Sequence, residues 1–221
     1  MRNKTLYSAI FDGEYPFGPL FKEVTTITSP SEMTEKDAVL ILWGGGDISP
    51  SLYGHGVSRA TGAGHDPSNR DMVEYGLANK AVELGIPVIG ICRGAQLMCA
   101  VSGGYLIQDV TGHTRSHQME DIETKEVMTT SSLHHQMMFP WGVAHQIIAR
   151  ALPAISEHYI AHPESSATDI NIEAIPCEPE IIWFPKTKSL CIQGHPEFMG
   201  VTTRYVEYCF ELVKKWLPHN Q

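Results

Sequence analysis

Continuous apolar runs alternate with amphipathic stretches along the first half of the chain. The run TLYSAIF (residues 5–11) and the run AVLILWGGGD (38–47) are typical of strands in a buried parallel sheet. Residues 68–84 carry apolar positions at helical spacing after the candidate N-cap Ser68. A third run, IPVIGI (86–91), leads through the glycines of GICRGAQ into another helix-like stretch. The order strand, glycine turn, helix is thus predicted twice in succession.

The second half of the chain has a less regular pattern. Strand-like alternation covers residues 125–136, 171–185 and 189–198, and residues 203–217 have the spacing of an amphipathic helix. The segment 111–170 is otherwise the least regular part of the chain, and we assign no secondary structure to the rest of it. It holds seven of the eleven histidines. Because strands and helices alternate, we predict an α/β fold, a three-layer sandwich with a mostly parallel central sheet.

Composition and charge limit the classes of partner. A length of 221 residues, 43% of them hydrophobic and 19% charged, suits a single domain spanning residues 1–221. The formal net charge is −9 and the chain has no run of basic residues. We therefore expect neither a nucleic-acid partner nor binding to an anionic membrane surface, and a small-molecule substrate remains open.

Cysteine usage and the N-terminal sequence indicate the compartment. The five cysteines are an odd number and include no CxxC pair, which favours reduced thiols. No apolar stretch near the start resembles a secretory signal, and no run approaches the length of a membrane span. The expected location is cytoplasmic.

Cys92 is the first candidate for chemistry. It stands in Gly90-Ile91-Cys92-Arg93-Gly94, at the predicted junction of a strand and a helix. Gly-x-Cys-x-Gly at such a junction is the layout of a nucleophile elbow, in which the glycines let strand and helix pass closely. A helix N-terminus and a nearby imidazolium would both favour the thiolate. Thiol hydrolases, amidotransferases and chaperone-like proteins share this layout, so the elbow alone leaves the function open.

His195 and Glu197 are the candidate partners of Cys92. They occur in GHPEF near the end of a predicted strand, where residues two apart point to the same face. The imidazole would act as general base and acid, and the carboxylate would fix its tautomer and orientation.

The glycines of GGGD provide a candidate anion site. A glycine loop at the end of a parallel strand can present backbone N–H groups to an anion. Acyl transfer needs two such donors for the tetrahedral oxyanion. We assign one donor to the backbone of Arg93, directly after the nucleophile, and the other to the loop at Gly44 and Gly45.

Taken together, WGGGD, GICRGAQ and GHPEF resemble the class I glutamine amidotransferase-like superfamily. The resemblance is closest to its γ-glutamyl-γ-aminobutyrate hydrolase and γ-glutamyl hydrolase branch. The residues that carry it are Gly44, Gly45, Asp47, Pro50, Leu52, Tyr53 and Gly54, then Arg70 and Asp71, then Gly103, Gly104, Gln108 and Asp109, and the segment SSLHHQ. The matching positions extend over most of the chain.

This resemblance implies a flavodoxin-like class I glutamine amidotransferase fold and a hydrolase of γ-glutamyl amides. By position, it implies Cys92 as nucleophile, His195 as general acid and base, and Glu197 as the orienting residue. The same comparison implies that three further residues contact the substrate: Gln96, Ser132 and His134. Attack of the thiol would form a γ-glutamyl thioester, release an amine or ammonia, and leave the thioester for water to hydrolyse.

The chain departs from the branch at two places. His55 follows Gly54 where the branch usually has glutamate, and the segment between His117 and SLHHQ is short. Both places belong to the expected leaving-group side of the pocket, so the amine half of the substrate stays open.

Three alternatives remain at the level of sequence. The first, within the same superfamily, is a glutaminase subunit that delivers ammonia to a separate synthetase, so a synthetase partner or a homodimer stays open. A non-catalytic binding module on the same fold is the second alternative. The third is a metal site built on His113 and His117, four residues apart, or on the adjacent His134 and His135. With no firm helix there, we predict no metal and no cofactor.

Overall fold

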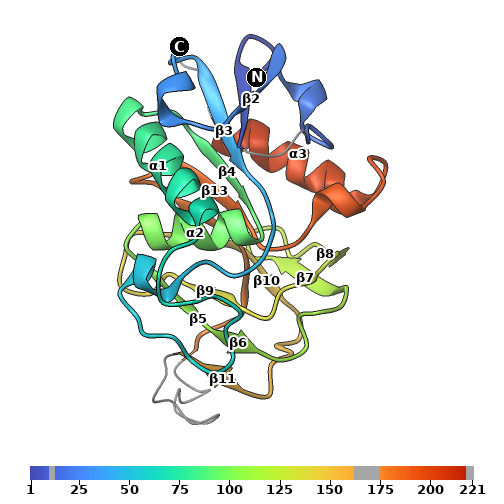
Figure 1. Cartoon of the computed structure of the whole chain (residues 1–221). Helices are drawn as coiled ribbons and strands as arrows, with labels where there is room; N and C mark the ends of the chain where they lie inside the picture. Colours follow the sequence, from blue (N-terminus) through green and yellow to red (C-terminus); the bar gives the residue numbers. More distant parts are fainter. Residues whose placement is uncertain (10–12, 162–174, 218–221) are drawn as a thin grey trace.

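The computed structural model describes residues 1–9, 13–161 and 175–217, and Figure 1 shows their arrangement. In the described residues, the main sheet has nine strands in the order β2-β1-β3-β4-β13-β12-β10-β7-β8. The strands of its parallel part are β2 (Glu23–Ile27), β1 (Thr5–Ala9), β3 (Ala38–Leu42), β4 (Val88–Ile91) and β13 (Ser189–Ile192). Those of its antiparallel part are β12 (Pro179–Phe184), β10 (Gln146–Ala151), β7 (His117–Asp121) and β8 (Val127–Thr130).

The predicted α/β fold is confirmed, and its sheet is mixed. The strands expected to be parallel are parallel, and the antiparallel part begins where β12 meets β13. Residues 185–188 alone connect these two strands. Such a short connection forces an antiparallel pair, because a parallel crossover needs about a dozen residues or more. Two small antiparallel sheets lie beside the main one: β5 (Tyr105–Ile107) with β9 (Met137–Phe139), and β6 (Asp109–Val110) with β11 (Tyr159–Ile160).

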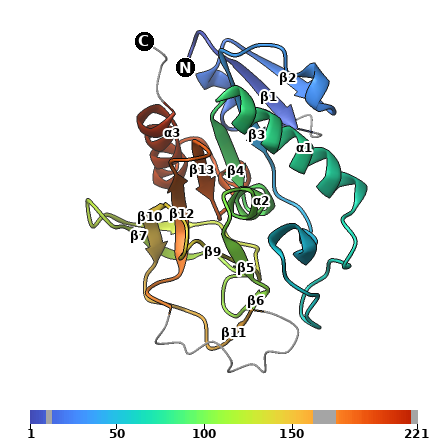
Figure 2. The same cartoon turned by 90° about the vertical axis from the view of Figure 1, so that its left-hand side faces the viewer.

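Helices cover both faces of the parallel part of the sheet. Helices α1 (Asn69–Leu84) and α2 (Arg93–Val101) pack on one face, and α3 (Arg204–Trp216) packs on the other, as Figures 1 and 2 show. Strand β3 shows the consequence, since Leu40 and Leu42 join the core under α1 and α2, while Val39 and Ile41 join the core under α3. A strand buried on both faces reads as a continuous apolar run, which explains the pattern in the sequence.

The boundaries of α1 agree with the sequence signals. Ser68 accepts a hydrogen bond from the backbone N–H of Asp71, whose carboxylate accepts one from the Ser68 N–H, so a capping box starts the helix. Gly85 ends it in the left-handed conformation, with a φ of 70°.

Several predicted strands are shorter in the structure. The first run forms β1, and its residues 10 and 11 lie outside the described part. Of the stretch 125–136, Val127–Thr130 form β8 and the remainder is loop. The stretch 171–185 contains β12, and its residues 171–174 lie outside the described part. In the described part of the chain, no helix combines the length and apolarity that crossing a membrane requires.

Candidate active site

Cys92 occupies a sharp turn between β4 and α2. Its backbone has φ 48° and ψ −105°, an unfavourable conformation for a residue with a Cβ that costs roughly 1–3 kcal/mol. A Cβ on Gly90 would lie 2.7 Å from the backbone nitrogen of Ala95, and one on Gly94 would overlap the carbonyl oxygen of Leu42. Only glycine fits at both positions, so the predicted nucleophile elbow is confirmed as a backbone structure.

His195 lies beside Cys92 because their two strands are neighbours. Ile91 of β4 pairs with Ile192 of β13, and the Cys92 N–H donates to the Ile192 carbonyl over 2.8 Å. The backbone N–H of His195 donates to the Ser131 carbonyl (3.0 Å), and the Ser131 hydroxyl donates to the His195 carbonyl (2.9 Å). The segment after β8 thus holds the histidine backbone in place.

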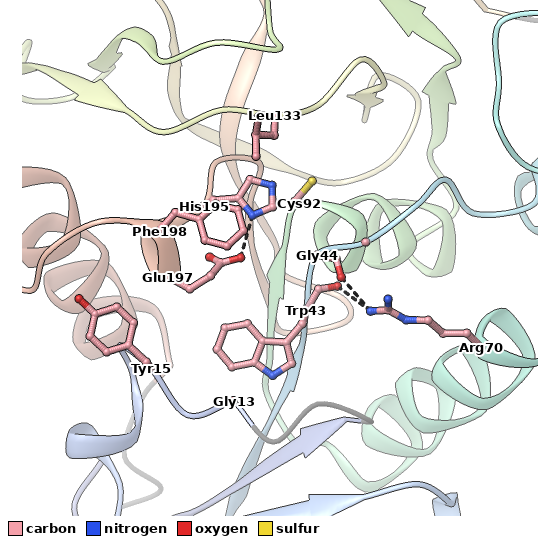
Figure 3. A pocket seen from close by; sticks show the side chains of 11 residues that line it. Gly13, Tyr15, Trp43, Gly44, Arg70, Cys92, Leu133, His195, Glu197 and Phe198 are labelled. Carbon is pink, nitrogen blue, oxygen red and sulfur yellow. Dashed lines mark hydrogen bonds and ion pairs between the residues drawn. The ribbon is translucent and has the colours of Figure 1, made fainter.

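Glu197 orients the imidazole, as predicted, but by a different local geometry. His195 Nδ1 lies 2.7 Å from Glu197 Oε1, and the second ring nitrogen lies on the side of the Cys92 sulfur (Figure 3). The strand β13 ends at Ile192, and Glu197 stands in the short 3₁₀ helix Pro196–Phe198. Its carboxylate therefore reaches the ring from a helical turn and not from a shared strand face. Phe198 stacks on the imidazole at a centroid distance of 4.7 Å.

The environment of His195 favours its protonated form. Burial alone would lower the pKa of the imidazole, but hydrogen bonding to Cys92 and Glu197 and the charges of these two groups outweigh it. The net effect raises the pKa of His195 to about 10. An imidazolium beside the sulfur stabilises a thiolate by charge attraction.

The glycine loop after β3 lies against the same pair of side chains. A Cβ on Gly44 would lie 2.8 Å from His195 Cε1 and 3.6 Å from Cys92 Cβ, so a side chain there would displace the imidazole. The guanidinium of Arg70 donates to the Gly44 carbonyl oxygen over 2.9 Å and fixes the loop. Arg93, the first residue of α2, has a backbone N–H without a partner inside the helix. The structure thus brings both predicted oxyanion donors, Arg93 and the loop of Gly44 and Gly45, to the elbow.

The side chain of Arg93 has a role that the sequence analysis missed. It is 3% exposed and forms ion pairs with Asp71 and Glu74 of α1. Glu74 also accepts from Arg70 Nε over 3.0 Å. This buried network joins the start of α2, the start of α1 and the glycine loop. The positions of its members in the sequence give no sign of the pairing, because Glu74 and Arg93 are 19 residues apart.

A cavity of about 580 Å³ opens above the elbow. Cys92, His195, Glu197, Gly44 and Gly45 all line it. Its other walls are largely apolar, and Figure 3 shows several of the side chains that form them: Tyr15, Trp43, Leu133 and Phe198. Leu133 and Phe198 are 61% and 63% exposed, so large apolar groups border the mouth of the cavity. Three of these residues lie in the motifs WGGGD, GHPEF and SSLHHQ, but the sequence analysis assigned no role to any of the four side chains.

The three residues expected to contact the substrate do not line this cavity. Gln96 donates to the Gln136 carbonyl (3.2 Å), Ser132 donates to the His113 carbonyl, and His134 Nδ1 lies 2.8 Å from the Gln136 carbonyl oxygen. All three side chains are buried, and burial lowers the pKa of His134 to about 3. Substrate contact by these residues thus stays a prediction that the geometry of the cavity does not support.

Comparisons with known proteins identify the family of the chain. The family model described as Peptidase C26 matches residues 26–197, a range that includes Cys92, His195 and Glu197. The glutamine amidotransferase-like protein YvdE of Lactococcus lactis subsp. lactis (strain IL1403) is 28% identical over an alignment of 193 residues that covers 78% of this chain and 71% of that protein. The YvdE homolog of Lactococcus lactis subsp. cremoris is 30% identical over an alignment of 155 residues that covers 57% of this chain and 81% of that protein.

Solved structures confirm the expected fold. A glutamine amidotransferase from Thermotoga maritima superposes with a TM-score of 0.55 and 15% sequence identity, covering 97% of this chain and 86% of that one. At this level of identity the likeness concerns the fold alone.

Proposed function

The chain belongs to the Peptidase C26 family, and from this membership and the site geometry we propose that it hydrolyses a γ-glutamyl amide bond through a thioester on Cys92. The observation that carries the proposal is the convergence of a strained cysteine elbow, a histidine held by glutamate and a glycine loop on one cavity. Each of these parts has a distinct task in acyl transfer.

The first half-reaction forms the thioester. The Cys92 sulfur attacks the γ-carbonyl carbon of the substrate, and the carbonyl oxygen becomes an oxyanion between the Arg93 N–H and the glycine loop. His195 gives its proton to the leaving nitrogen, the C–N bond breaks, and an amine or ammonia departs. Glu197 holds the imidazole through Nδ1 during this transfer.

The second half-reaction restores the enzyme. His195, now neutral, takes a proton from a water molecule whose oxygen attacks the thioester carbon. The same donors hold the second oxyanion, the C–S bond breaks to restore the Cys92 thiolate, and the glutamyl group leaves as the free acid, which gives its carboxyl proton to solvent. The His195 proton then remains beside the Cys92 sulfur for the next cycle.

The pH dependence of turnover follows from the raised pKa of His195. Proton delivery to the leaving nitrogen needs imidazolium, which persists through neutral pH and is lost as the pH rises through about 10. Because Glu197 is one cause of this high pKa, Glu197→Gln is expected to move the alkaline fall of kcat/KM down by about 1–3 pH units. It should also lower kcat/KM by roughly 10²–10⁴-fold. Rate profiles between about pH 6 and 11 test this, and an unmoved alkaline limb would contradict the role of Glu197.

The apolar walls of the cavity favour a substrate whose leaving amine has an apolar or aromatic body. We therefore expect a γ-glutamyl anilide to be hydrolysed with a higher kcat/KM than glutamine. Leu133→Ala should lower kcat/KM for the anilide by roughly fivefold, about 1 kcal/mol, and leave glutamine turnover nearly unchanged. A steady-state comparison of the two substrates with both proteins is the measurement. Equal losses for both substrates would show that Leu133 does not contact the leaving group.

A further inference from the structure

A second cluster of titratable side chains lies apart from the cavity, in the antiparallel half of the molecule. Three histidines and one glutamate meet there from separate parts of the chain: His113, His117, His134 and Glu180. Three of these residues are buried, and the side chain of His117 is 9% exposed. His117 begins β7 and Glu180 stands in β12, so the topology and not a helical i, i+4 spacing brings the residues together.

The distances within the cluster suit a shared ion. Glu180 Oε1 lies 2.8 Å from His117 Nε2 and 3.2 Å from His113 Nδ1. One ligand atom from each of these three residues can be chosen such that all lie within 4.8 Å of one another. Zinc bonds of about 2.0–2.1 Å place neighbouring ligand atoms of a tetrahedral site about 3.3 Å apart. Small movements of these three side chains therefore suffice to hold an ion. His134 is not in this group of close ligand atoms, and its ring must turn toward them to supply a fourth ligand.

The opposite nitrogen of every ring already has an acceptor. His113 Nε2 lies 3.2 Å from Glu178 Oε2, His117 Nδ1 lies 3.0 Å from the Arg115 carbonyl oxygen, and His134 Nδ1 lies 2.8 Å from the Gln136 carbonyl oxygen. A metal-binding histidine nearly always donates its second N–H to a carboxylate or a carbonyl, which turns the other nitrogen toward the metal. All three rings have this arrangement.

Two atoms on the inner side, His117 Nε2 and Glu180 Oε1, form a hydrogen bond of 2.8 Å, and three other atoms there form none with the described part of the chain. Within the described residues, His134 Nε2, His113 Nδ1 and Glu180 Oε2 are buried atoms without a hydrogen-bond partner. The ring of His134 lies 4.8 Å, centroid to centroid, from that of His113. Buried polar atoms without hydrogen bonds destabilise the folded state, and an ion bound among them would remove that cost.

We propose that His113, His117, His134 and Glu180 bind one Zn²⁺ ion as a closed structural site. Three imidazoles and one carboxylate match the ligand types and the coordination number that zinc prefers. Four protein ligands leave no position for a substrate, so the ion stabilises the fold and takes no part in the chemistry. This proposal departs from the sequence-based expectation of no metal.

The proposed zinc site would stabilise Ser131 and Ser132, the segment that contacts the backbone of His195. The Ser132 hydroxyl donates to the His113 carbonyl oxygen, and the preceding residue, Ser131, makes two hydrogen bonds to the His195 backbone. Glu178 supports His113 from outside and accepts from the Ile155 N–H (2.7 Å), the Ser156 N–H (2.8 Å) and the Tyr159 hydroxyl (2.7 Å). These hydrogen bonds fix the Glu178 carboxylate, which in turn orients the ring of His113.

Metal content measured by mass spectrometry tests the proposal without reference to activity. The full chain, incubated with Zn²⁺ and dialysed, is expected to retain about one zinc per chain, and removal of that zinc by a chelator should lower Tm. Cobalt in place of zinc should give the intense visible absorption of four-coordinate Co²⁺. Less than about 0.1 zinc per chain, with no change of Tm, would overturn the proposal and leave an ion-paired cluster.

Variants distinguish the residues that bind zinc from residues that only lie near the site. Glu180→Gln keeps the side-chain shape and should abolish stoichiometric zinc binding. Glu178→Gln should weaken zinc binding about 10–100-fold, because the carboxylate that orients the ring of His113 is lost. His145→Ala is the matched control, since its Nδ1 also lies 2.8 Å from a backbone carbonyl but outside the cluster. Retention of zinc by Glu180→Gln, or its loss from His145→Ala, would contradict the assignment. If Glu180→Gln does not fold, the wild-type stoichiometry and the Glu178→Gln affinity decide the question.

Discussion

Replacing Cys92 by serine is expected to lower kcat/KM for γ-glutamyl amide hydrolysis by about 10⁴-fold or more. The hydroxyl has nearly the size of the thiol, so the elbow keeps its shape. However, a hydroxyl is a far weaker acid than a thiol, and His195 cannot turn it into a comparable nucleophile. Initial rates with a γ-glutamyl anilide, measured at enzyme concentrations high enough to detect the residual rate, give the magnitude.

The control for this experiment is Cys177→Ser. Cys177 is half-buried and lies outside the cavity, so its replacement should leave kcat/KM within about a factor of two. Thermal unfolding should show Cys92→Ser to be as stable as the wild type within about 0.5 kcal/mol. Near-normal turnover by a folded Cys92→Ser protein would refute the thioester mechanism.

Replacing Arg93 by methionine is expected to lower the free energy of unfolding by about 3–5 kcal/mol. The methionine fills much of the same space, but two buried carboxylates, Asp71 and Glu74, lose their ion pairs with the guanidinium. Arg70 remains beside Glu74, which places the expected loss at the lower end of this range. Urea denaturation followed by circular dichroism measures it.

A matched control lies on the surface of α1, the helix that carries Asp71 and Glu74. Lys80 pairs with Glu83 over 3.0 Å, with 32% and 67% of the two side chains exposed. Lys80→Met should cost less than about 1 kcal/mol, because water already screens this pair. Adding Asp71→Asn and Glu74→Gln to Arg93→Met should recover part of the stability. Similar losses of unfolding free energy for Arg93→Met and Lys80→Met would mean that burial does not make the Arg93 ion pairs more important for stability than an exposed pair.

The sequence predicted those parts of the site whose residue type is determined by the local backbone conformation. Gly90 and Gly94 flank Cys92 because only glycine fits where strand and helix pass, and such a requirement leaves a visible pattern. The pairing of His195 with Glu197 was also predictable, because only Pro196 stands between them in the sequence. The expected reason was wrong, because a 3₁₀ turn replaces the end of the strand.

Contacts between distant segments were not predictable in the same way. Arg93 meets Glu74, Leu133 joins the wall opposite Trp43, and Glu180 meets His117 only after the sheet is assembled. No local periodicity records such pairs. The antiparallel half of the sheet was equally hard to foresee, because its strands β7, β8 and β10 lack the continuous apolar runs of the parallel half.

The most direct test of the account is to trap the acyl-enzyme and locate it. Wild-type protein turning over a γ-glutamyl anilide is quenched in acid, and its intact mass and peptide masses are determined. The account predicts one γ-glutamyl group per chain, attached to Cys92 and absent from the other four cysteines. A diazo-ketone analogue of glutamine should label the same residue alone. An acyl group or label on another cysteine, or turnover with neither acyl-enzyme nor labelling at Cys92, would contradict the account.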